Sequence, residues 1–564
     1  MPPRSEDETR NATIMATEES PLLSAPANIP LHNNAIAPDK ALLSRVYAEL
    51  LDQLDTALPT LQGMVFTKIP WLISLRFVGG IGAHELAAAA LATTLCNVTG
   101  LSLSVGLSSA LSTLSGQAKG ELVSRMLHEK RRRVSFDLAA GEEGGIGLGE
   151  ETTNSQNDEP ITPVIFFWRG MVIQLSVVIP IAIWWLFGVK DVLIALGQAE
   201  LLSTMTEAYL QVLAPSLLGY SINWTITAWL QSIGMADVPA KASVLGLVLH
   251  VPFNYFFIYF LEWGYLGCAV ATTCFNIIQP IFIISYLCFY DHGRRRLLES
   301  SGGTSIGRTH LTFWNEFWIA VSSIPGHMQY FALALPGIVI ISEWWASETA
   351  IFLSGRLVPD PEVAVGGMTI YQSINTFCFM FPVAFAISAS TRVGNLLGAG
   401  QPKGAAFAAN VSILSAGCLS FAMGTMLFCI PHTFLPSLFA PGAEDVILET
   451  SRTLPLLAIY VFADGIQVAL NGIIKGCGRQ LVTVPIVVFA YWVVAVPLSC
   501  YIAFVRHERE MFCDDSYFCG DVGLVAGMAT GTWVHMLLLA IVVGLSTNWE
   551  LEARNAKERV AKKR

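Results

Sequence analysis

The chain has 564 residues, of which 53% are apolar and only 13% are charged, about half the usual share of charge. Its mean hydropathy is +0.54. These values exclude a disordered or fibrous chain and argue against a soluble enzyme, because a soluble surface of this size needs more charge to cover it. The formal net charge of −10 argues against a nucleic-acid partner. The composition predicts a polytopic membrane protein, in which each span takes about 20 residues.

The first segment, residues 1–58, is polar and acidic and has no basic stretch ahead of an apolar run. We expect no cleaved signal peptide and predict a disordered cytosolic tail. Within it, Glu18-Glu-Ser-Pro-Leu-Leu23 resembles an acidic dileucine sorting signal. A sorting adaptor would read such a signal on traffic to vacuoles or lysosomes.

Twelve apolar runs follow and predict twelve transmembrane helices. The first six are expected at about 61–81, 86–113, 163–188, 203–232, 239–260 and 265–289. The second six are expected at about 328–356, 364–390, 404–434, 450–473, 481–504 and 522–545.

The two sets of six resemble each other. The end of span two, Ser108–Lys119, matches the end of span eight, Ser388–Lys403, since both are rich in small residues and run into a Gly-rich turn. Gln231-Ser-Ile-Gly234 likewise matches Lys475-Gly-Cys-Gly478. An even helix count gives both copies the same orientation, a recurring transporter plan with the substrate path at the repeat interface.

The predicted fold class is therefore an all-α polytopic membrane protein with two six-helix lobes around a central cavity. We expect the N-lobe at 59–310, with a long cytosolic loop near 120–160, and the C-lobe at 311–546. A basic cytosolic tail at 547–564 closes the chain.

Basic residues gather in the loops after spans two, six and ten and in the last residues, whereas the opposite loops are acidic or neutral. By the positive-inside rule both termini are expected in the cytosol. The first basic loop contains Arg132-Arg-Val-Ser135, which fits a basophilic kinase site, so Ser135 is a candidate phosphosite.

Three acidic residues are expected deep in the membrane: Glu343 and Glu348 in span seven and Asp464 in span ten. An Asp at the centre of a span costs about 2.5–3.5 kcal/mol on insertion scales, so such residues are usually functional. We expect these three to couple protons or bind cations. Glu343 and Glu348 point about 140° apart on an ideal helix. Both line one cavity only if span seven bends, and Pro336 lies where it could kink.

Polar residues also line single helix faces. Spacings of 4, 3, 4 and 4 place five span-ten residues on one face, namely Tyr460, Asp464, Gln467, Asn471 and Lys475. The matching positions of span four carry Tyr220 opposite Asp464, followed by Asn223, Thr227 and Gln231. A hydrated substrate cavity and plain interhelical hydrogen bonds both explain these faces.

Three further residues are candidates for the same cavity. Asn97 begins a polar face on span two. Trp344 and Tyr371 would supply cation–π contacts, although packing aromatics fit them equally well.

Eleven cysteines are present, mostly inside apolar runs. Cys513 and Cys519 lie in the loop between spans eleven and twelve, where either a disulfide or two free thiols fit. No Cys/His cluster has metal spacing, and no nucleotide-binding loop or catalytic cluster occurs. We therefore expect no metal, no cofactor and no enzymatic activity.

Several segments resemble the multidrug and toxic compound extrusion (MATE) family in its eukaryotic branch. Ser390-Thr-Arg-Val-Gly-Asn-Leu-Leu-Gly-Ala-Gly400 resembles the family signature, which contributes the motif residues Arg392, Gly394, Asn395, Gly398 and Gly400. Glu343-Trp-Trp-Ala-Ser-Glu348, Asp464-Gly-Ile-Gln467 and Lys475-Gly-Cys-Gly478 resemble its seventh and tenth spans. The likeness covers about residues 60–560, in order.

The resemblance implies a proton-coupled exporter of organic cations and drug-like compounds, with Glu343, Glu348 and Asp464 at the acidic positions that handle protons and cations. Ser112 and Lys119 replace an acid and a Tyr of the span-two motif. Span one lacks the Asp of many bacterial members, so coupling is expected in the second lobe.

The predicted function is a secondary antiporter that exports organic cations, drugs or metabolites in exchange for protons. We expect a monomer in the vacuolar or plasma membrane of a eukaryote. A lipid-linked sugar flippase shares the two-lobe plan but should have a basic cavity, whereas the deep charges here are mainly acidic. A membrane receptor without transport is the remaining alternative, and it leaves the buried acids unexplained.

Overall fold

The computed structural model describes residues 38–79, 81–142, 162–195, 198–300, 310–514 and 516–561. Within these ranges the chain is helical apart from turns and an isolated parallel bridge between Val358 and Glu510. The all-α prediction is confirmed.

The first half contains α2 (Pro38–Gly79), α3 (Ala83–Cys96), η2 (Asn97–Leu101), α4 (Ser102–Glu142), α5 (Pro163–Phe187), α6 (Val189–Ala195), α7 (Glu200–Ser232), α8 (Asp237–Tyr255), η3 (Phe256–Phe260), α9 (Gly264–Phe289) and α10 (Asp291–Ser300). The second half contains α11 (His310–Ser322), α12 (Ile324–Ile340), α13 (Ser342–Ser354), α14 (Pro361–Gly398), α15 (Pro402–Cys429), α16 (Phe434–Phe439), α17 (Glu444–Cys477), α18 (Gln480–Val487), η4 (Val488–Ala495), α19 (Val496–Cys500), η5 (Tyr501–Arg506), α20 (Gly520–Ser546) and α21 (Trp549–Ala561). The η elements are π-helical turns that continue the neighbouring α-helices.

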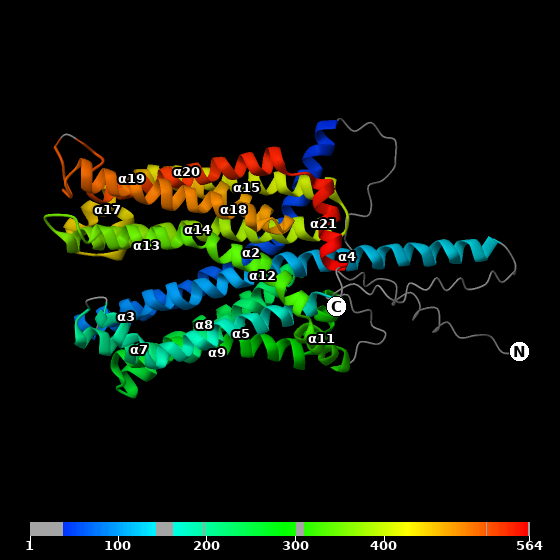
Figure 1. Cartoon of the computed structure of the whole chain (residues 1–564), viewed down its shortest axis with the longest axis horizontal. Helices are drawn as coiled ribbons and strands as arrows, with labels where there is room; N and C mark the ends of the chain where they lie inside the picture. The colour runs from blue at the N-terminus through cyan, green and yellow to red at the C-terminus, as the bar shows by residue number, and fades with distance from the viewer. Residues whose placement is uncertain are drawn as a thin grey trace, which may run out of the picture.

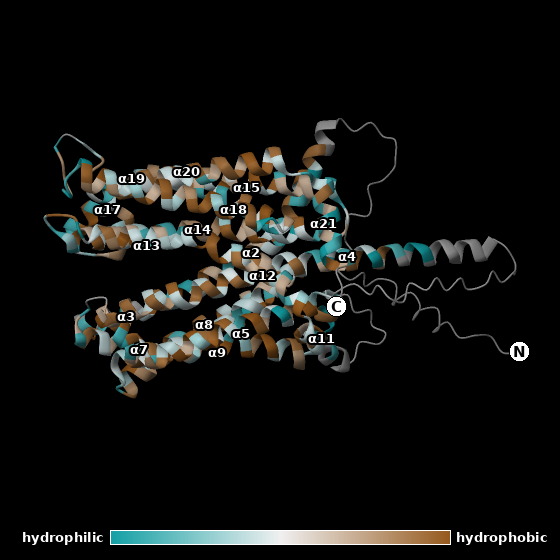
Figure 2. Ribbon diagram, in the orientation of Figure 1, coloured by the Kyte–Doolittle hydropathy of each residue, from teal (hydrophilic) through white to brown (hydrophobic). Residues whose placement is uncertain are grey.

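All twelve expected spans fall on helical stretches. Among the described residues, ten stretches are long and apolar enough to cross a membrane. The other two expected spans lie in α2 and α7, which are 42 and 33 residues long but richer in polar side chains. Figure 2 shows hydrophobic residues along the bundle and hydrophilic ones toward the loops and on α4 where it leaves the bundle.

The helices form two groups that lie together at one end and diverge toward the other (Figure 1). We call the end where α2 begins and α21 lies the base, and the opposite end the far end. Each group has its own apolar core: Trp185 and Leu210 are buried in the N-lobe, and Leu457 and Tyr491 in the C-lobe. The lobes therefore fold as separate packing units.

The expected lobe boundary at residue 311 is wrong, because α11 and α12 pack on the N-lobe. Tyr330 of α12 donates a hydrogen bond to the carbonyl oxygen of Leu107 at 3.0 Å, and both residues belong to one apolar core. Gly337 lies so close to α4 that a Cβ atom there would overlap Ser109. α12 also contacts α18 of the C-lobe. After a turn at Ile341, α13 packs on α14 and α20.

The expected tail boundary at residue 58 is also wrong, because α2 is helical from Pro38. Its first half packs on the C-lobe: Gln53 donates from Nε2 to the carbonyl oxygen of Ala408 at 3.0 Å, and Ser388 donates to the carbonyl oxygen of Gln53 at 2.8 Å. Buried amide hydrogen bonds hold this segment, which a disordered tail would leave unmade. The first half of span one thus packs on the C-lobe, and the first half of span seven packs on the N-lobe.

Two further expectations change at the base. The loop expected near 120–160 begins as helix, since α4 continues to Glu142. The basic C-terminal segment contains α21, which docks on the base through a hydrogen bond from Arg559 Nη1 to the carbonyl oxygen of Cys477 at 2.7 Å. Gln329 in turn donates to the carbonyl oxygen of Arg559 at 3.0 Å, so α21 touches both lobes.

Candidate functional site

The break in the seventh span positions its first acid. Ile341 separates α12 from α13, and Glu343 lies in the first turn of α13. The N-terminal turn of a helix favours a negative charge because its backbone dipoles point their positive end there. The indole of Trp492 donates to Ser342 at 3.3 Å and fixes this turn against η4. The predicted bend is therefore present, although it lies five residues after Pro336.

Glu343 belongs to a polar network made by three C-lobe helices. Gln467 of α17 donates from Nε2 to Glu343 Oε2 at 2.9 Å. The same amide nitrogen lies 2.9 Å from His535 Nδ1 of α20, and His535 Nδ1 lies 3.5 Å from Glu343 Oε2. Gln467 and His535 are fully buried, whereas the Glu343 side chain keeps 20% of its exposure. The carboxylate therefore keeps some exposure that its two partners lack.

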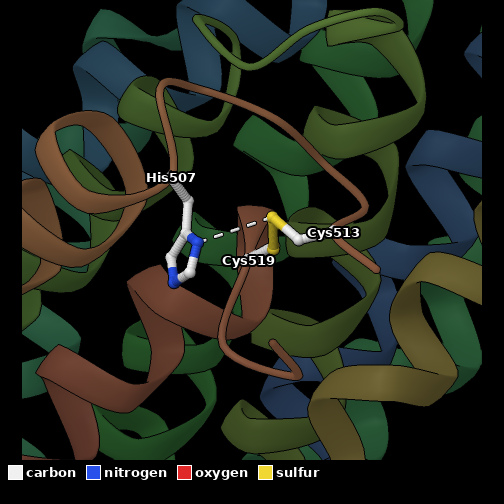
Figure 3. Close-up of side chains that lie close together, drawn as sticks. All are labelled: His507, Cys513 and Cys519. Carbon is white, nitrogen blue, oxygen red and sulfur yellow. Dashed lines mark hydrogen bonds between the residues drawn. A yellow bond between two sulfur atoms is a disulfide. The ribbon is translucent and has the colours of Figure 1, made fainter. Parts of the chain in front are cut away.

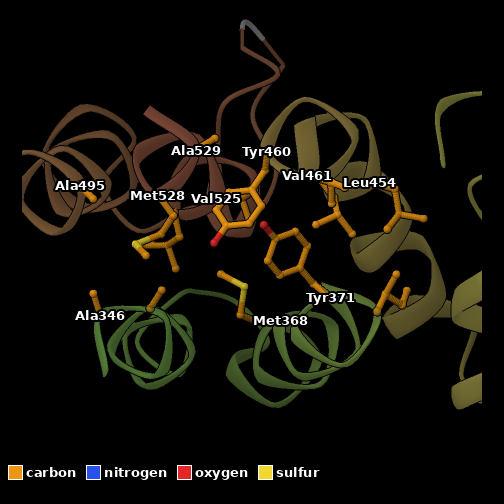
Figure 4. Packing of buried hydrophobic residues seen from close by; sticks show 14 of the residues in the cluster. Ala346, Met368, Tyr371, Leu454, Tyr460, Val461, Ala495, Val525, Met528 and Ala529 are labelled. Atoms are coloured by element: carbon orange, nitrogen blue, oxygen red, sulfur yellow. The ribbon is translucent and has the colours of Figure 1, made fainter. Parts of the chain in front are cut away.

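Asp464 lies beside this network and is only 3% exposed. Its charge and that of Glu343 repel each other. Tyr371 and Tyr460 line a small pocket next to it together with Ser347 and Asn375. Figure 4 shows both tyrosine rings pointing into the space between α14 and α17. Within the part of the chain that the structure describes, the hydroxyl of Tyr371 and the Asn375 side-chain oxygen have no hydrogen-bond partner, so the pocket offers free polar atoms.

Glu348 lies apart from this network, next to Trp344 and to a cation of the other lobe. The ammonium of Lys68 in α2 lies 5.4 Å from the centre of a Trp344 ring. Lys68 and Glu348 attract each other across the interface, and Trp344 also interacts with Glu348. An aromatic face beside a carboxylate is the usual arrangement for binding an organic cation. In this structure a side chain of the protein itself occupies it.

The polar face of the N-lobe is used differently. Asn223 donates to Gln279 Oε1 at 3.1 Å within the lobe, and Gln231 donates to Thr60 at 3.3 Å. Thr227 and Asn97 are half-buried, and Asn97 opens the π-helical turn η2. The structure therefore does not bring these four residues to the acids, and interhelical hydrogen bonding accounts for two of them.

Two span-ten residues complete the C-lobe picture. Asn471 is 6% exposed, and its side-chain oxygen has no hydrogen-bond partner among the described residues. Lys475 is half-buried near the base, where its charge attracts Glu343. Three residues of the predicted α17 face therefore act on Glu343, namely Asp464, Gln467 and Lys475.

The family-signature residues lie at the base, where the lobes touch. Gly398 lies so close to Gln117 of α4 that a Cβ atom would overlap its backbone, and Gly120 is equally close to Asn395. Gln117 donates to the carbonyl oxygen of Gly476 at 3.0 Å. Small residues on both helices allow this approach. Gly394 is buried in the same contact.

Arg392 and Gly400 mark the two borders of that contact. Arg392 forms ion pairs with Glu49 at 2.6 Å and Asp52 at 3.0 Å on the first half of α2. Gly400 ends α14 with a φ of +71°, which favours glycine. The signature therefore closes the base rather than lining a substrate cavity.

In the structure Cys513 and Cys519 form a disulfide in the far-end loop. His507 Nδ1 lies 3.5 Å from Cys513 Sγ (Figure 3). These three side chains have metal-ligand chemistry, but the disulfide consumes both thiols.

Ser135 lies on the protruding end of α4, and Glu18–Leu23 lies outside the described residues.

Sequence reasoning missed one residue of the site and two further buried acids. His535 gives no sign of its place in the network, because its partners Gln467 and Glu343 lie on other helices. Glu449 and Asp521 were not counted among the buried acids, yet both are fully buried. Each directly precedes an expected span, at 450 and 522, so the sequence pattern placed them in loops. A search for acids within one turn of a span end would have found them.

Two crossed helical lobes with buried acids in their interior define a membrane transporter rather than a soluble catalyst. The MatE family model matches residues 59–133, 165–256 and 337–501. Protein DETOXIFICATION 12 of Arabidopsis thaliana is 29% identical over 492 residues, 87% of each chain. Protein DETOXIFICATION 13 of the same plant is 29% identical over 495 residues, again 87% of each.

The crystal structure of the eukaryotic MATE transporter AtDTX14 is similar to this structure, with a TM-score of 0.73 and 25% sequence identity. The match covers 91% of this chain and 99% of that one. The chain belongs to the MatE family. It is an integral, multi-pass membrane efflux transporter with two six-helix lobes, and it is not an enzyme, so the predicted family and fold class are confirmed.

Proposed function

We propose that this protein exports organic cations, drugs or similar metabolites in exchange for protons. The observation that carries the proposal is the network of Glu343, Gln467 and His535 beside the buried Asp464. Two nearby carboxylates offer sites for protons, and Gln467 and His535 hold the hydrogen bonds around Glu343. Trp344, Tyr371 and the free oxygens of Asn471 and Asn375 offer aromatic and polar contacts for a cargo.

Exchange follows from competition for one charge. A buried carboxylate has lost the solvation of its charge, and it recovers stabilisation by binding either a proton or a cation. From the acidic side Glu343 or Asp464 takes a proton and releases the cargo. Facing the cytosol it loses the proton and binds the next cation. One pH unit supplies about 1.4 kcal/mol per proton, which is tenfold in cargo accumulation.

The contact at the base supports alternating access. Gly398, Gly120 and Gln117 join the lobes there, so the acids are sealed from the base in this conformation. We propose that the base faces the cytosol, with both termini, because the basic loops lie there. Opening toward the cytosol would separate α4 from α14.

Further parts of the proposal concern the cellular setting. The protein acts as a monomer, because the glycine stripe of α20 is used inside the chain: a Cβ atom on Gly527 would overlap Ser499, and one on Gly531 would overlap Ala495. It resides in the vacuolar or plasma membrane of a eukaryote, in contact with lipid. A sorting adaptor would bind Glu18–Leu23, and phosphate on Ser135 would weaken the basic charge at the base.

The test is uptake of a fluorescent organic cation into acid-loaded proteoliposomes. Asp464→Asn should abolish pH-driven accumulation, whereas Glu444→Gln, at an exposed acid of the same helix, should leave it intact. Undiminished uptake by Asp464→Asn removes Asp464 from the coupling role. Movement of a lipid-linked sugar instead of the cation would favour the flippase alternative, and cargo binding without uptake would favour a receptor.

A further inference from the structure

A second pair of acids lies at the far end of the C-lobe. Glu449 is in the second turn of α17 and Asp521 in the first turn of α20. Both are fully buried, with relative exposures of 0%. Glu449 lies fifteen residues along α17 from Asp464, or about 22 Å on a straight helix, and Asp521 lies beside Glu449. The pair is therefore separate from the proposed transport site.

Most of the carboxylate oxygens in this pair have no partner. Glu449 Oε2 accepts a hydrogen bond from Arg452 Nη1 at 2.8 Å. Among the described residues Glu449 Oε1 and both oxygens of Asp521 have none, although the backbone N–H of Asp521 also stabilises Glu449. A fully buried, unpartnered carboxylate is costly as an anion, since neither water nor a donor stabilises its charge. Asp521 therefore lacks what an ionised side chain needs at this depth.

The two side chains converge on one point of α14. A Cβ atom on Gly367 would lie 3.3 Å from Glu449 Cγ and 3.4 Å from Asp521 Oδ2. The hydroxyl of Thr450 donates to the carbonyl oxygen of Gly367 at 3.3 Å and holds α14 against α17. A glycine at this place leaves room for both carboxyl groups, which lie close enough to repel each other.

The charges in the cluster do not balance. In the part of the chain that the structure describes, Arg452 is the charged group that acts on the two carboxyls besides each other. α14 contributes Gly367, and the far-end loop contributes the carbonyl oxygen of Met511, which accepts from Arg452 at 2.8 Å. Two carboxylates and one guanidinium leave one negative charge, which a single positive charge would neutralise.

We propose that Glu449 and Asp521 together hold one exchangeable proton, in a second proton site at the far end of the C-lobe. A proton fits better than a metal ion, because a hard cation such as Ca²⁺ takes six to eight oxygen ligands. Here three carboxylate oxygens are free. A protonated Asp521 becomes a donor and can share its hydrogen with Glu449.

The site also controls a contact with the far-end loop. Arg452 binds Glu449 and the Met511 carbonyl with the same nitrogen and lies 4.6 Å from the centre of the Phe512 ring. Tyr517 of the loop donates to the Arg452 carbonyl oxygen. Losing the proton leaves Arg452 shared between two anions, which draws it inward and loosens the loop.

The role of this proton deepens the proposed antiport and rests on it. If the far end faces the acidic compartment, the pair meets incoming protons before Asp464 does. The existence of the site does not depend on transport, so binding and transport are measured separately.

The experiment is infrared difference spectroscopy of the purified full chain between neutral and alkaline pH, where exposed carboxyl groups are already ionised, without cargo, in a background that carries Glu343→Gln, Glu348→Gln and Asp464→Asn. That background should retain a protonated-carboxyl band, and adding Asp521→Asn should remove it, while adding Glu444→Gln should not. Glu449→Gln should shift the pH at which the band disappears. A band that survives Asp521→Asn overturns the proposal, as does a titration that sodium chloride abolishes, which indicates a sodium site.

A second measurement uses the unaltered protein, so it does not depend on whether Asp521→Asn folds. A hydrophobic carbodiimide reacts with protonated buried carboxyl groups, and peptide mass spectrometry locates the adduct. Label on the peptide of Asp521 or Glu449, falling as the pH rises, is expected. Label confined to other acids overturns the proposal. Failure of the antiport appears instead as normal labelling here with no pH-driven uptake in proteoliposomes.

Discussion

At matching positions of the two repeats, the N-lobe carries Tyr220 and the C-lobe carries Asp464. Tyr220 stacks on Trp224 of its own helix, with ring centroids 5.9 Å apart, whereas Asp464 lies beside Glu343 and an amide–imidazole network. The repeats thus share a helix plan while ionisable groups concentrate in one lobe. In this duplicated fold the N-lobe position is therefore occupied by a packed aromatic side chain, and the C-lobe position by an ionisable one.

The amides show the same difference. Asn223 of the N-lobe pairs with the Gln279 amide, and Gln467, its C-lobe counterpart, pairs with a carboxylate. Amide–amide pairs are neutral and independent of pH, but an amide–carboxylate bond changes when the carboxylate binds a proton. Proton coupling is therefore expected in the C-lobe alone.

The largest effect is expected when the carboxylate that distinguishes the C-lobe from the N-lobe is removed. Glu343→Gln should abolish pH-driven accumulation of an organic cation, because the network then contains no carboxylate that exchanges a proton. Asn223→Ala, at the N-lobe counterpart of Gln467, should reduce the uptake rate by no more than about threefold, the effect of losing one hydrogen bond within a bundle. Uptake into acid-loaded proteoliposomes measures both variants. Equal losses would show that the two lobes share the coupling.

The next effect concerns the contact that joins the lobes. Gly398→Ala places a methyl group against the Gln117 backbone, and overpacking of this kind costs about 1–3 kcal/mol. The base-closed state should become less populated, so a cysteine introduced at Thr113 should react faster with a maleimide from the base side. Gly404→Ala is the matched control, since its Cβ would make ordinary contact at 3.5 Å. Unchanged reactivity in Gly398→Ala would contradict the closed-base interpretation.

These contrasts also show what the sequence could reveal. All twelve spans were predictable: ten are apolar over the length of a membrane, and the two in α2 and α7 are more polar but long enough. The reciprocal crossing of α2 and α12 was not, since Gln53 and Tyr330 give no sign of which lobe their partners Ala408 and Leu107 occupy.

The candidate site was predictable to a similar extent. Glu343 and Asp464 stand out as charges inside apolar runs, and the structure places them side by side. His535 depends on contacts with other helices. Glu449 and Asp521 look like loop residues until the helices are seen to begin at Glu444 and Gly520. The sequence marks unusual residues inside spans but not partnerships between spans.

A smaller effect is expected where the N-lobe reaches into the C-lobe site. Lys68→Met removes the ammonium that lies over Trp344, so a cargo no longer has to displace it. A cation–π contact is worth about 0.5–2 kcal/mol, and the half-saturating concentration of a monovalent organic cation should fall by about three- to tenfold. Lys68→Arg keeps the charge and should resemble the wild type. A weaker apparent affinity in Lys68→Met would mean that Lys68 assists cargo binding.

The smallest effect tests the crossing of α2 onto the C-lobe. Glu49→Gln removes the closer of two carboxylates that bind Arg392, at 2.6 Å, and leaves Asp52 at 3.0 Å. Because Asp52 still neutralises Arg392, the cost should be about 1 kcal/mol, a fall of one or two degrees in thermal unfolding midpoint. Asp55→Asn, at an exposed position one turn away, should have no effect.

The contact of α12 with the N-lobe allows the matching test. Tyr330→Phe removes the hydrogen bond to Leu107 by which α12 docks on the N-lobe. The Leu107 carbonyl keeps its bond within α4, so the cost should be about 0.5–1.5 kcal/mol. The unfolding midpoint should therefore fall by a similar amount in Tyr330→Phe and in Glu49→Gln. A clearly larger fall in Glu49→Gln would mean that the base depends on charge rather than on packing, and that its closure should weaken with salt.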